Sequence, residues 1–199
     1  MNTKPDGRLE RGRARRELLL DAAVAVIATN GSGLLTHRAV AAEAGVSLAS
    51  VTYHFSGIAE LRQASFDHAG SRIGLAFRAL VEAHRDEPHR LPELTGGHAR
   101  TLVGQSRQDT LAVYEMILAS SHDESLRPVI RELDGHLADL LTGYVGGRET
   151  GLVVASAIQG LILSHLARGD SADADADSDA TALAHAIADL VHRFAAPTL

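Results

Sequence analysis

Apolar residues recur at helical spacing along almost the whole chain of 199 residues. The first stripe follows the i, i+3, i+4, i+7, i+8 pattern of one helix face, and Asn30-Gly31 ends it, because this pair favours the left-handed backbone found at helix C-termini. The members of this stripe are Leu19, Ala22, Ala23, Val26 and Ile27. Similar patterns predict further helices over residues 58–84, 93–105, 109–120, 126–144, 149–167 and 181–195. Since no strand-period alternation stands out, the sequence predicts an all-α fold.

The segment from Thr36 to Phe55 predicts two short helices separated by a tight turn. Thr36 and Ser47 stand where a hydroxyl can cap a helix start, and Gly45 stands at the turn, where a positive φ costs glycine little. Apolar residues of both helices can pack with the 19–27 stripe; they are Val40, Ala41, Ala44, Val46, Val51 and Phe55. This pattern predicts a helix-turn-helix whose second helix enters a major groove, with an ordinary αα-corner as the alternative.

The composition narrows the class of protein. Aromatic residues make up 4% of the chain and Trp is absent, so aliphatic side chains must fill the core. The absence of Cys excludes thiol catalysis, disulfides and zinc fingers. The N-terminal region lacks the apolar segment of a secretory signal, and the apolar stretch over 151–167 is short for a membrane span and interrupted by polar residues. We therefore expect a soluble, cytoplasmic protein that does not enter a membrane.

Charge is distributed unevenly along the chain. Residues 1–16 hold six basic against two acidic side chains, whereas residues 63–199 hold eleven against nineteen. A basic N-terminal segment on an acidic protein indicates that only this segment contacts a polyanion. The alternative is that the segment is a tail that increases solubility. We expect a basic flexible arm over 1–16, a helix-turn-helix DNA-binding domain over 17–57, and a larger helical domain over 58–199 for ligand binding and dimerisation.

The helix-turn-helix segment resembles the N-terminal domain of TetR-type transcriptional repressors. Residues 36–47 read Thr-x-Arg-x-Val-Ala-x-x-Ala-Gly-Val-Ser, and Val-x-Tyr-His-Phe follows at 51–55, with Leu61 further on. The remaining two thirds of the chain match such proteins only in length and helical layout. The resemblance implies a homodimer, a three-helix DNA-binding head, and a helical body that binds a small molecule and thereby releases the operator.

The chain departs from the family pattern at two places. Family members commonly carry a lysine at the start of the fourth helix, but residues 55–58 read Phe-Ser-Gly-Ile, so the phosphate contact of that lysine is missing. Thr52 also replaces the first of the usual two aromatic residues, before Tyr53. Both departures affect the expected DNA contacts rather than the fold.

The residues of the head divide into those that position the DNA and those that read bases. We expect phosphate contacts from Thr36, Ser47, Tyr53 and His54, helped by Arg13, Arg15 and Arg16. Arg38 is the only long donor on the two short helices and can bind guanine O6 and N7 as a fork. The other exposed positions of the second helix are Leu48, Ala49, Ser50 and Thr52, of which the first two suit thymine methyls. Packing beside Phe55 is the alternative for Tyr53 and His54.

The last two predicted helices suit a dimer interface. The helix over 149–167 is apolar on most of its circumference, and the helix over 181–195 carries an apolar stripe formed by Leu183, Ile187, Leu190, Val191 and Phe194. We expect the two helices to form a four-helix bundle with their copies in a partner, as the resemblance also implies, with burial against their own body as the alternative. The Asp-rich stretch over 169–180 is interpreted as a solvated linker.

An effector site is expected among the helices between residues 58 and 145. The candidate lining residues are Phe77, His98, Tyr114, Glu115, Met116, Leu133 and His136. Glu115 is the most specific of these predictions, because a carboxylate on an otherwise apolar helix requires a partner. A structural ion pair with Arg127 or Arg131 is the alternative role of Glu115. The eleven histidines form no i, i+4 pair on one helix, so we expect neither a metal site nor a cofactor.

These features favour a ligand-responsive DNA-binding regulator, most simply a repressor that a small-molecule effector releases from a palindromic double-stranded operator. A DNA-binding protein without a ligand is the alternative, and the acidic body argues against it because such a protein needs a basic surface throughout. A helical enzyme is disfavoured, since the sequence shows no nucleophile–base pair or phosphate-binding loop.

Overall fold

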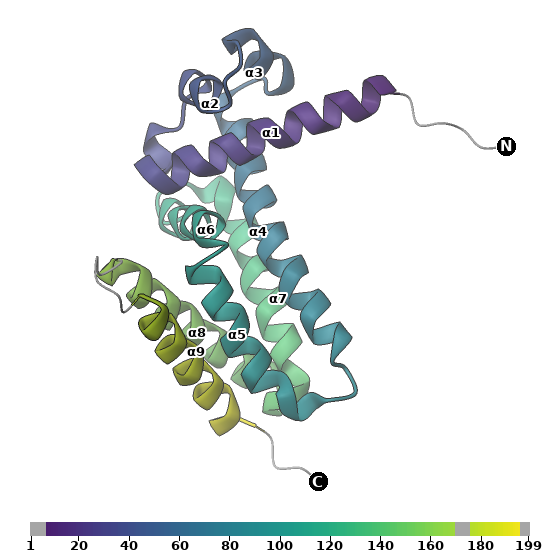
Figure 1. Ribbon diagram of the computed structural model, residues 1–199, viewed down its shortest axis with the longest axis vertical. Coiled ribbons are helices and arrows are strands. Elements are labelled where there is room, and N and C mark those ends of the chain that lie inside the picture. Colours follow the sequence, from purple (N-terminus) through teal and green to yellow (C-terminus); the bar gives the residue numbers. More distant parts are fainter. Residues whose placement is uncertain (1–6, 170–175, 196–199) are drawn as a thin grey trace, which may run out of the picture.

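The computed structural model describes residues 7–169 and 176–195, and within these ranges the regular structure is entirely helical. The α-helices are α1 (Gly7–Asn30), α2 (His37–Glu43), α3 (Leu48–His54), α4 (Ile58–Ala83), α5 (Leu91–Val103), α6 (Arg107–Ala119), α7 (Arg127–Val145), α8 (Arg148–Arg168) and α9 (Ala176–Arg193). Short 3-10 turns lie before α2, α5 and α7. The predicted all-α fold is confirmed. Figure 1 shows α2 and α3 at one end of the molecule and α8 and α9 toward the other.

Two predicted boundaries are wrong. Helix α1 begins at Gly7, so residues 7–16, which were expected to form a flexible arm, are helical. Arg, Leu, Glu and Ala dominate this stretch, and all four are strong helix formers. Figure 1 shows this end of α1 extending beyond the rest of the head. Helix α9 begins at Ala176, inside the predicted linker, and Asp177 and Asp179 in its first turn favour the helix start.

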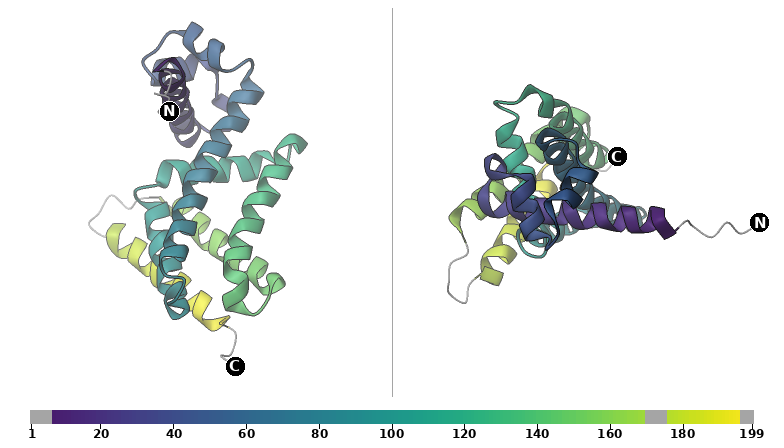
Figure 2. Two further views of the ribbon diagram at one scale, coloured as in Figure 1. Left: turned by 90° about the vertical axis from the view of Figure 1, so that its right-hand side faces the viewer. Right: turned by 90° about the horizontal axis from the view of Figure 1, so that it is seen from above.

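The head and the adjoining body share one hydrophobic core. Leu19 and Ile27 of α1, Val51 of α3 and Phe66 of α4 are fully buried in the same cluster as Met116 of α6. The expected boundary after residue 57 therefore crosses a continuous core. A second cluster joins α5, α7, α8 and α9 with the far half of α4. In Figure 2, α4 runs from the head into the body and links the two regions.

Helix α9 packs against α5 of its own chain through a close backbone approach. A Cβ placed at Gly96 would collide with the carbonyl oxygen of Ala184. Leu183, Ile187 and Val191 are buried in the second core as a result. For these three residues the expected role in the dimer face is wrong, because the α5–α9 contact already covers the apolar stripe of α9.

We expect Gly96→Ala to lower the free energy of unfolding by about 1–3 kcal/mol, because the added methyl must push α9 away from α5. Gly97→Ala is the matched control, since nothing lies within 4 Å of a Cβ there, and it should raise stability by up to about 1 kcal/mol through helix propensity. Urea unfolding of both variants measures the difference. Equal stabilities would contradict the close α5–α9 packing.

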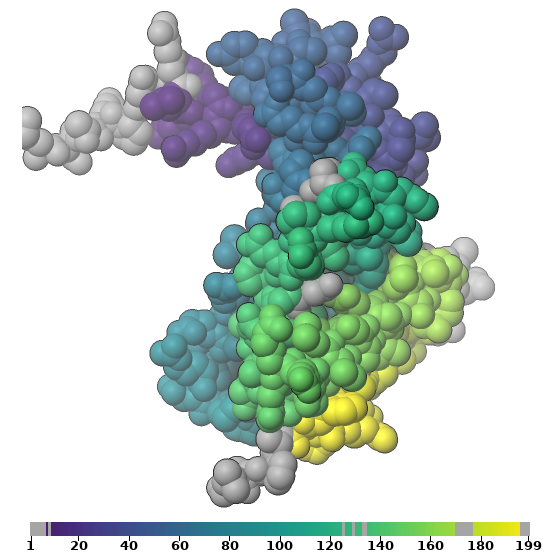
Figure 3. All heavy atoms as spheres, turned by 180° about the vertical axis from the view of Figure 1, so that it is seen from behind, coloured from purple at the N-terminus to yellow at the C-terminus, as the bar shows by residue number. Residues whose placement is uncertain are grey.

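Helix α8 has one covered and one uncovered face. Val154, Ile158 and Ile162 are buried in the second core, whereas Val153 is 59% exposed and Leu163 is 42% exposed. Among the described helices, α8 alone is long and apolar enough to cross a membrane by length and composition. Its covered face packs on α7 and α9 of the body. Figure 3 shows the outer surface of α8 beside these helices, from behind. The uncovered face of α8 is thus an apolar surface that none of the described residues covers.

Candidate nucleic-acid interface and ligand cavity

Hydroxyl caps and one glycine hold the helix-turn-helix. The backbone N–H of Ala39 donates to Thr36 Oγ1 at 3.1 Å, and the N–H of Ser50 donates to Ser47 Oγ at 3.3 Å. Gly45 adopts a φ of 63° between the two helices, in the left-handed region that glycine tolerates. Both predicted caps and the predicted turn are confirmed. The two caps fix where α2 and α3 begin, and the turn at Gly45 sets the direction of α3 relative to α2.

Helix α3 presents one side chain to the core and most of the others to solvent. Val51 is fully buried, whereas Tyr53 is 85% exposed and Leu48 is 44% exposed. Ala49 and Thr52 are also exposed, and Ser50 is half-buried. The alternative in which Tyr53 packs into the core is therefore wrong. The surface of α3 is free to contact another molecule at the end of the structure seen in Figure 1.

Two polar side chains of α3 are oriented by neighbours. The Thr52 hydroxyl donates back to the carbonyl oxygens of Leu48 and Ala49, at 3.3 and 3.2 Å. The half-buried His54 ring meets the Tyr53 ring edge-on, with the centroids 5.1 Å apart. The hydroxyl proton of Thr52 is thus used within the helix, and the hydroxyl oxygen can still accept a hydrogen bond from another molecule.

Exposed arginines lie on the two helices that precede α3. Arg38 is exposed on α2 and makes no ion pair with the residues that the structure describes. The guanidinium of Arg16 lies over the Phe55 ring, 4.9 Å from its centroid, in a cation–π contact that joins α1 to the end of α3. Arg13 and Arg15 are exposed on the same helix α1. The arginines of α1 that were predicted to position DNA therefore belong to a helix rather than to a flexible arm.

The start of α4 carries an acidic capping arrangement where the family lysine is missing. The backbone N–H and the hydroxyl of Ser56 both donate to Glu60 Oε2, at 2.8 and 2.7 Å. These hydrogen bonds, the one from the Ser56 side chain foremost, lower the pKa of Glu60. Sequence reasoning missed Glu60, although a Glu in the first turn of a helix, here three residues after the N-cap Gly57, is a readable capping signal.

A cavity of about 630 Å³ lies among the helices of the body. Of the predicted lining residues, Phe77, His98, Tyr114, Met116 and His136 line it. The side chain of Leu133 lies outside the described part of the structure. The cavity also reaches α8, beyond the region from 58 to 145 where the site was expected, and the α8 residues that line it are Ile158, Gln159 and Ile162.

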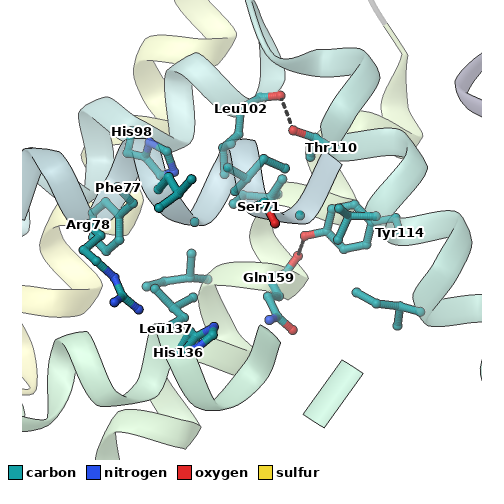
Figure 4. A pocket seen from close by; sticks show the side chains of 18 of the residues that line it. Ser71, Phe77, Arg78, His98, Leu102, Thr110, Tyr114, His136, Leu137 and Gln159 are labelled. Carbon is teal, nitrogen blue, oxygen red and sulfur yellow. Dashed lines mark hydrogen bonds between the residues drawn. The ribbon is translucent and has the colours of Figure 1, made fainter. Parts of the chain in front are cut away.

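Two buried hydroxyl groups of the cavity wall donate to the backbone. Tyr114 Oη donates to the carbonyl oxygen of Gln159 at 2.6 Å, and Thr110 Oγ1 donates to that of Leu102 at 2.8 Å, as Figure 4 shows. Burial raises the pKa of Tyr114, so the phenol stays protonated. The bond from Tyr114 also ties α6 to α8 across the cavity.

The imidazole of His98 forms a flat wall with Phe77. The two rings are stacked with centroids 4.9 Å apart and an interplanar angle of 26°. In Figure 4 they lie side by side, on α5 and α4. Burial lowers the pKa of His98 from 6.5 to about 4, so the ring is neutral at physiological pH.

This pKa makes stability depend on pH. In the unfolded chain His98 takes up a proton below about pH 6.5, whereas in the folded chain it stays neutral down to about pH 4, so the unfolded state binds more protons in this window. As the pH falls from 6.5 to 4, wild type should lose about 1–3 kcal/mol more stability than His98→Phe. Urea unfolding across this pH range measures the difference, and parallel losses in both proteins would contradict it.

Glu115 does not line the cavity, so its predicted role there is wrong. Its carboxylate accepts a hydrogen bond from the backbone N–H of Ser32 at 3.0 Å, beside Gly31 at the end of α1. Neither alternative ion pair holds, because Arg127 pairs with Glu124 and Glu115 faces the head. Glu115 had a partner as expected, but the partner is a backbone amide 83 residues away.

Ion pairs join the head to the body. Arg72 of α4 contacts Asp21 of α1 at 2.8 Å and Asp109 of α6 at 3.1 Å. His68 Nε2 also lies 2.9 Å from Asp21 Oδ1. Burial raises the pKa of Asp109, and the nearby Arg72 opposes this shift. Asp109 directly precedes the cavity residue Thr110, so the ion pairs connect the cavity wall to α1.

Comparison with known proteins identifies this architecture. The model described as "Bacterial regulatory proteins, tetR family" matches residues 19–64, and the model "Tetracyclin repressor-like, C-terminal domain" matches residues 88–197, more than half of the chain. The chain belongs to the TetR family of bacterial transcriptional regulators, with a DNA-binding helix-turn-helix, as its sequence motif indicated. No curated protein sequence matches the chain significantly.

Solved structures of family members superpose on most of the chain. A TetR family member from Streptomyces coelicolor A3 is 27% identical, with a TM-score of 0.71, over 92% of this chain and 99% of that one. The multidrug binding protein EbrR, in a complex with ethidium, is 29% identical, with a TM-score of 0.63, over 92% and 99% of the two chains. A regulator from Rhodococcus sp. Rha1, 19% identical with a TM-score of 0.72, shares the fold over 92% and 99%.

Proposed function

We propose that this chain is a ligand-responsive repressor that acts in the cytoplasm and that a small molecule releases from a palindromic operator. The observation that carries the proposal is the position of the cavity directly behind the helices that support the head. Thr110, Val113 and Met116 of α6 line the cavity, and α6 packs against α1. A molecule that moves α6 or α4 would therefore move the head. The similar protein EbrR has been solved in complexes with ethidium and proflavin, which supports a small-molecule ligand for this chain.

The head binds DNA through α3 in the major groove. Leu48 and Ala49 pack on thymine methyls, while Thr36, Ser47, Tyr53 and His54 contact phosphates. Ser50 and Thr52 lie on α3 toward the same groove, and Arg38 reads guanine from α2. The exposure of α3 and of Arg38 supports this assignment, as does the basic surface of α1.

Replacing Arg38 with alanine should weaken operator binding by about 1–3 kcal/mol and relax the preference at one base pair in each half-site. Binding of wild type and Arg38→Ala to a set of single-base operator variants tests both effects. If the variant weakens binding to every sequence equally, Arg38 contacts only phosphate.

The ion pairs of Arg72 give a route from the cavity to the head. Arg72 joins Asp109, beside the cavity, to Asp21 of α1. Rearrangement of α6 around a ligand would pull on these pairs and on the bond from Ser32 to Glu115. Both contacts are made by α6, so one movement of this helix changes the support of the head at two points.

The homodimer forms through α8 and the outward side of α9. Val153, Gly160 and Leu163 lie exposed on one side of α8, and Phe194 after α9 is 41% exposed. An apolar surface of this kind favours association with a second copy. Two heads related by a two-fold axis read a palindrome, which gives the specificity that one short helix lacks.

The alternative is a DNA-binding protein without a ligand. A helical body whose packed core leaves no cavity would favour this alternative. A cavity of about 630 Å³ with an apolar wall favours the ligand-responsive protein instead. The test is to screen small molecules for loss of the protein–operator complex by fluorescence anisotropy. We expect a molecule that binds the cavity to release the DNA, whereas molecules that bind the cavity without any change in DNA affinity would favour the alternative.

A further inference from the structure

We propose that the effector is an uncharged, planar aromatic molecule with one hydrogen-bonding group, and that His98 binds this group. The inference rests on the proposed function, since it names the ligand class of the same cavity. Three observations carry it: the shape of the wall, the state of its polar groups, and the location of its charges.

The wall favours a flat, apolar ligand. Phe66 and Phe77 are almost completely buried, and Phe77 is stacked on His98 with an angle of 26° between the rings. Tyr114 adds a third buried ring from α6. A planar aromatic molecule can lie against the Phe77–His98 pair, and this contact excludes water from the apolar surface of the ligand and from that of the cavity wall. The volume of about 630 Å³ accommodates a ligand of several fused rings.

Most polar side chains of the inner wall have no free proton for a ligand. The hydroxyls of Thr95, Thr110 and Tyr114 donate to the carbonyl oxygens of Leu91, Leu102 and Gln159 respectively. By contrast, the His98 ring makes no hydrogen bond with the described residues and is stacked on Phe77. A neutral imidazole offers one N–H donor and one acceptor nitrogen. The Ser71 hydroxyl also lines the cavity, but Ser71 is exposed. His98 is therefore the group of the inner wall that we assign to a polar atom of the ligand.

The charges of the cavity lie where water reaches them. Asp67, Arg78 and Glu132 line the cavity, but all three are exposed, as is His136. Among the lining side chains that the structure describes, no carboxylate or guanidinium group is buried, and the half-buried His98 ring is neutral. A charged ligand that entered the inner part would lose its hydration without gaining a counterion there. The cavity thus disfavours both cations and anions relative to a neutral molecule of the same shape.

Three probes with one ring system test this preference on the full-length protein. At mildly alkaline pH acridine is uncharged, proflavin carries a positive charge, and acridine-9-carboxylate carries a negative charge. Their fluorescence gives the dissociation constants directly. We expect acridine to bind at least about tenfold more tightly than either charged probe, because only acridine enters without an unpaired charge. Equal or tighter binding of proflavin or of acridine-9-carboxylate would overturn the inference.

Variants at position 98 test the role assigned to His98. His98→Phe keeps a flat ring beside Phe77 but removes the donor and the acceptor, so acridine should bind about fivefold more weakly. His98→Gln restores both groups and should bind acridine more tightly than His98→Phe does. His122→Phe, at an exposed position outside the cavity, is the control and should match wild type. An unchanged affinity in folded His98→Phe would contradict the role of His98.

The same samples separate this inference from the proposed function. If the protein binds operator DNA but none of the probes, the proposed ligand class is wrong and the regulatory role remains. The same holds if a charged probe releases the protein from the operator. Tight binding of acridine by a protein that does not bind DNA supports the ligand class and contradicts the regulatory role.

Discussion

Replacing Ala49 with glutamate is expected to weaken operator binding by about a hundredfold or more. Ala49 is exposed on α3, with no role in the core, so a glutamate there leaves the head folded. In the groove the new carboxylate faces the negative potential of DNA and meets no donor that could offset its lost hydration. Like charges brought together at an interface cost several kcal/mol, and a dimer carries the substitution twice. Anisotropy with labelled operator DNA measures the change.

Ala76→Glu is the matched control for this substitution. Ala76 is also exposed and helical, but it lies near the far end of α4, away from the head. The control keeps the net charge equal to that of the α3 variant, so a general electrostatic repulsion would affect both. Wild-type affinity in Ala49→Glu would contradict the assignment of α3 to the groove.

Replacing Gly160 with arginine is expected to break the homodimer and, with it, high-affinity operator binding. Gly160 lies on the exposed side of α8, and nothing lies within 4 Å of a Cβ placed there, so the monomer tolerates the side chain. In the dimer the same side chain would have to be buried between apolar surfaces. Burial of an unpaired charge costs several kcal/mol, which corresponds to about a hundredfold or more in the dimer dissociation constant.

Gly143→Arg controls for the chemistry of this substitution. Gly143 is an exposed glycine of α7 with open space around it, outside the proposed interface. Sedimentation velocity should find Gly160→Arg as a folded monomer and Gly143→Arg as a dimer. A dimer in both variants would place the interface elsewhere than on α8.

The features that sequence reasoning predicted correctly are local. Thr36, Gly45 and Ser47 act within a few residues of their own position, so their spacing alone indicated the caps and the turn that the structure contains. The same holds for the long helices, whose apolar stripes indicate both the element and the face that is buried.

The features that it missed depend on contacts between distant residues. Glu115 was recognised as needing a partner, but a backbone amide 83 residues away leaves no sequence signal. The apolar stripe around Ile187 indicated burial without indicating whether α5 or a second copy would cover it. Gly96 could have indicated that α5 covers this stripe, because a glycine inside a helix often permits the close approach of another backbone. The ion pairs of Arg72 also join residues that are far apart in the sequence.

The most direct test of the central claim is the selection of DNA from a random pool by the full-length protein, followed by sequencing. The claim is that an exposed α3 in each of two symmetric protomers reads the major groove. It predicts an enriched palindrome whose half-sites lie at a spacing matched to the turn of the double helix. The result that would contradict it is a pool without enrichment, or a single unrepeated site bound by a monomer.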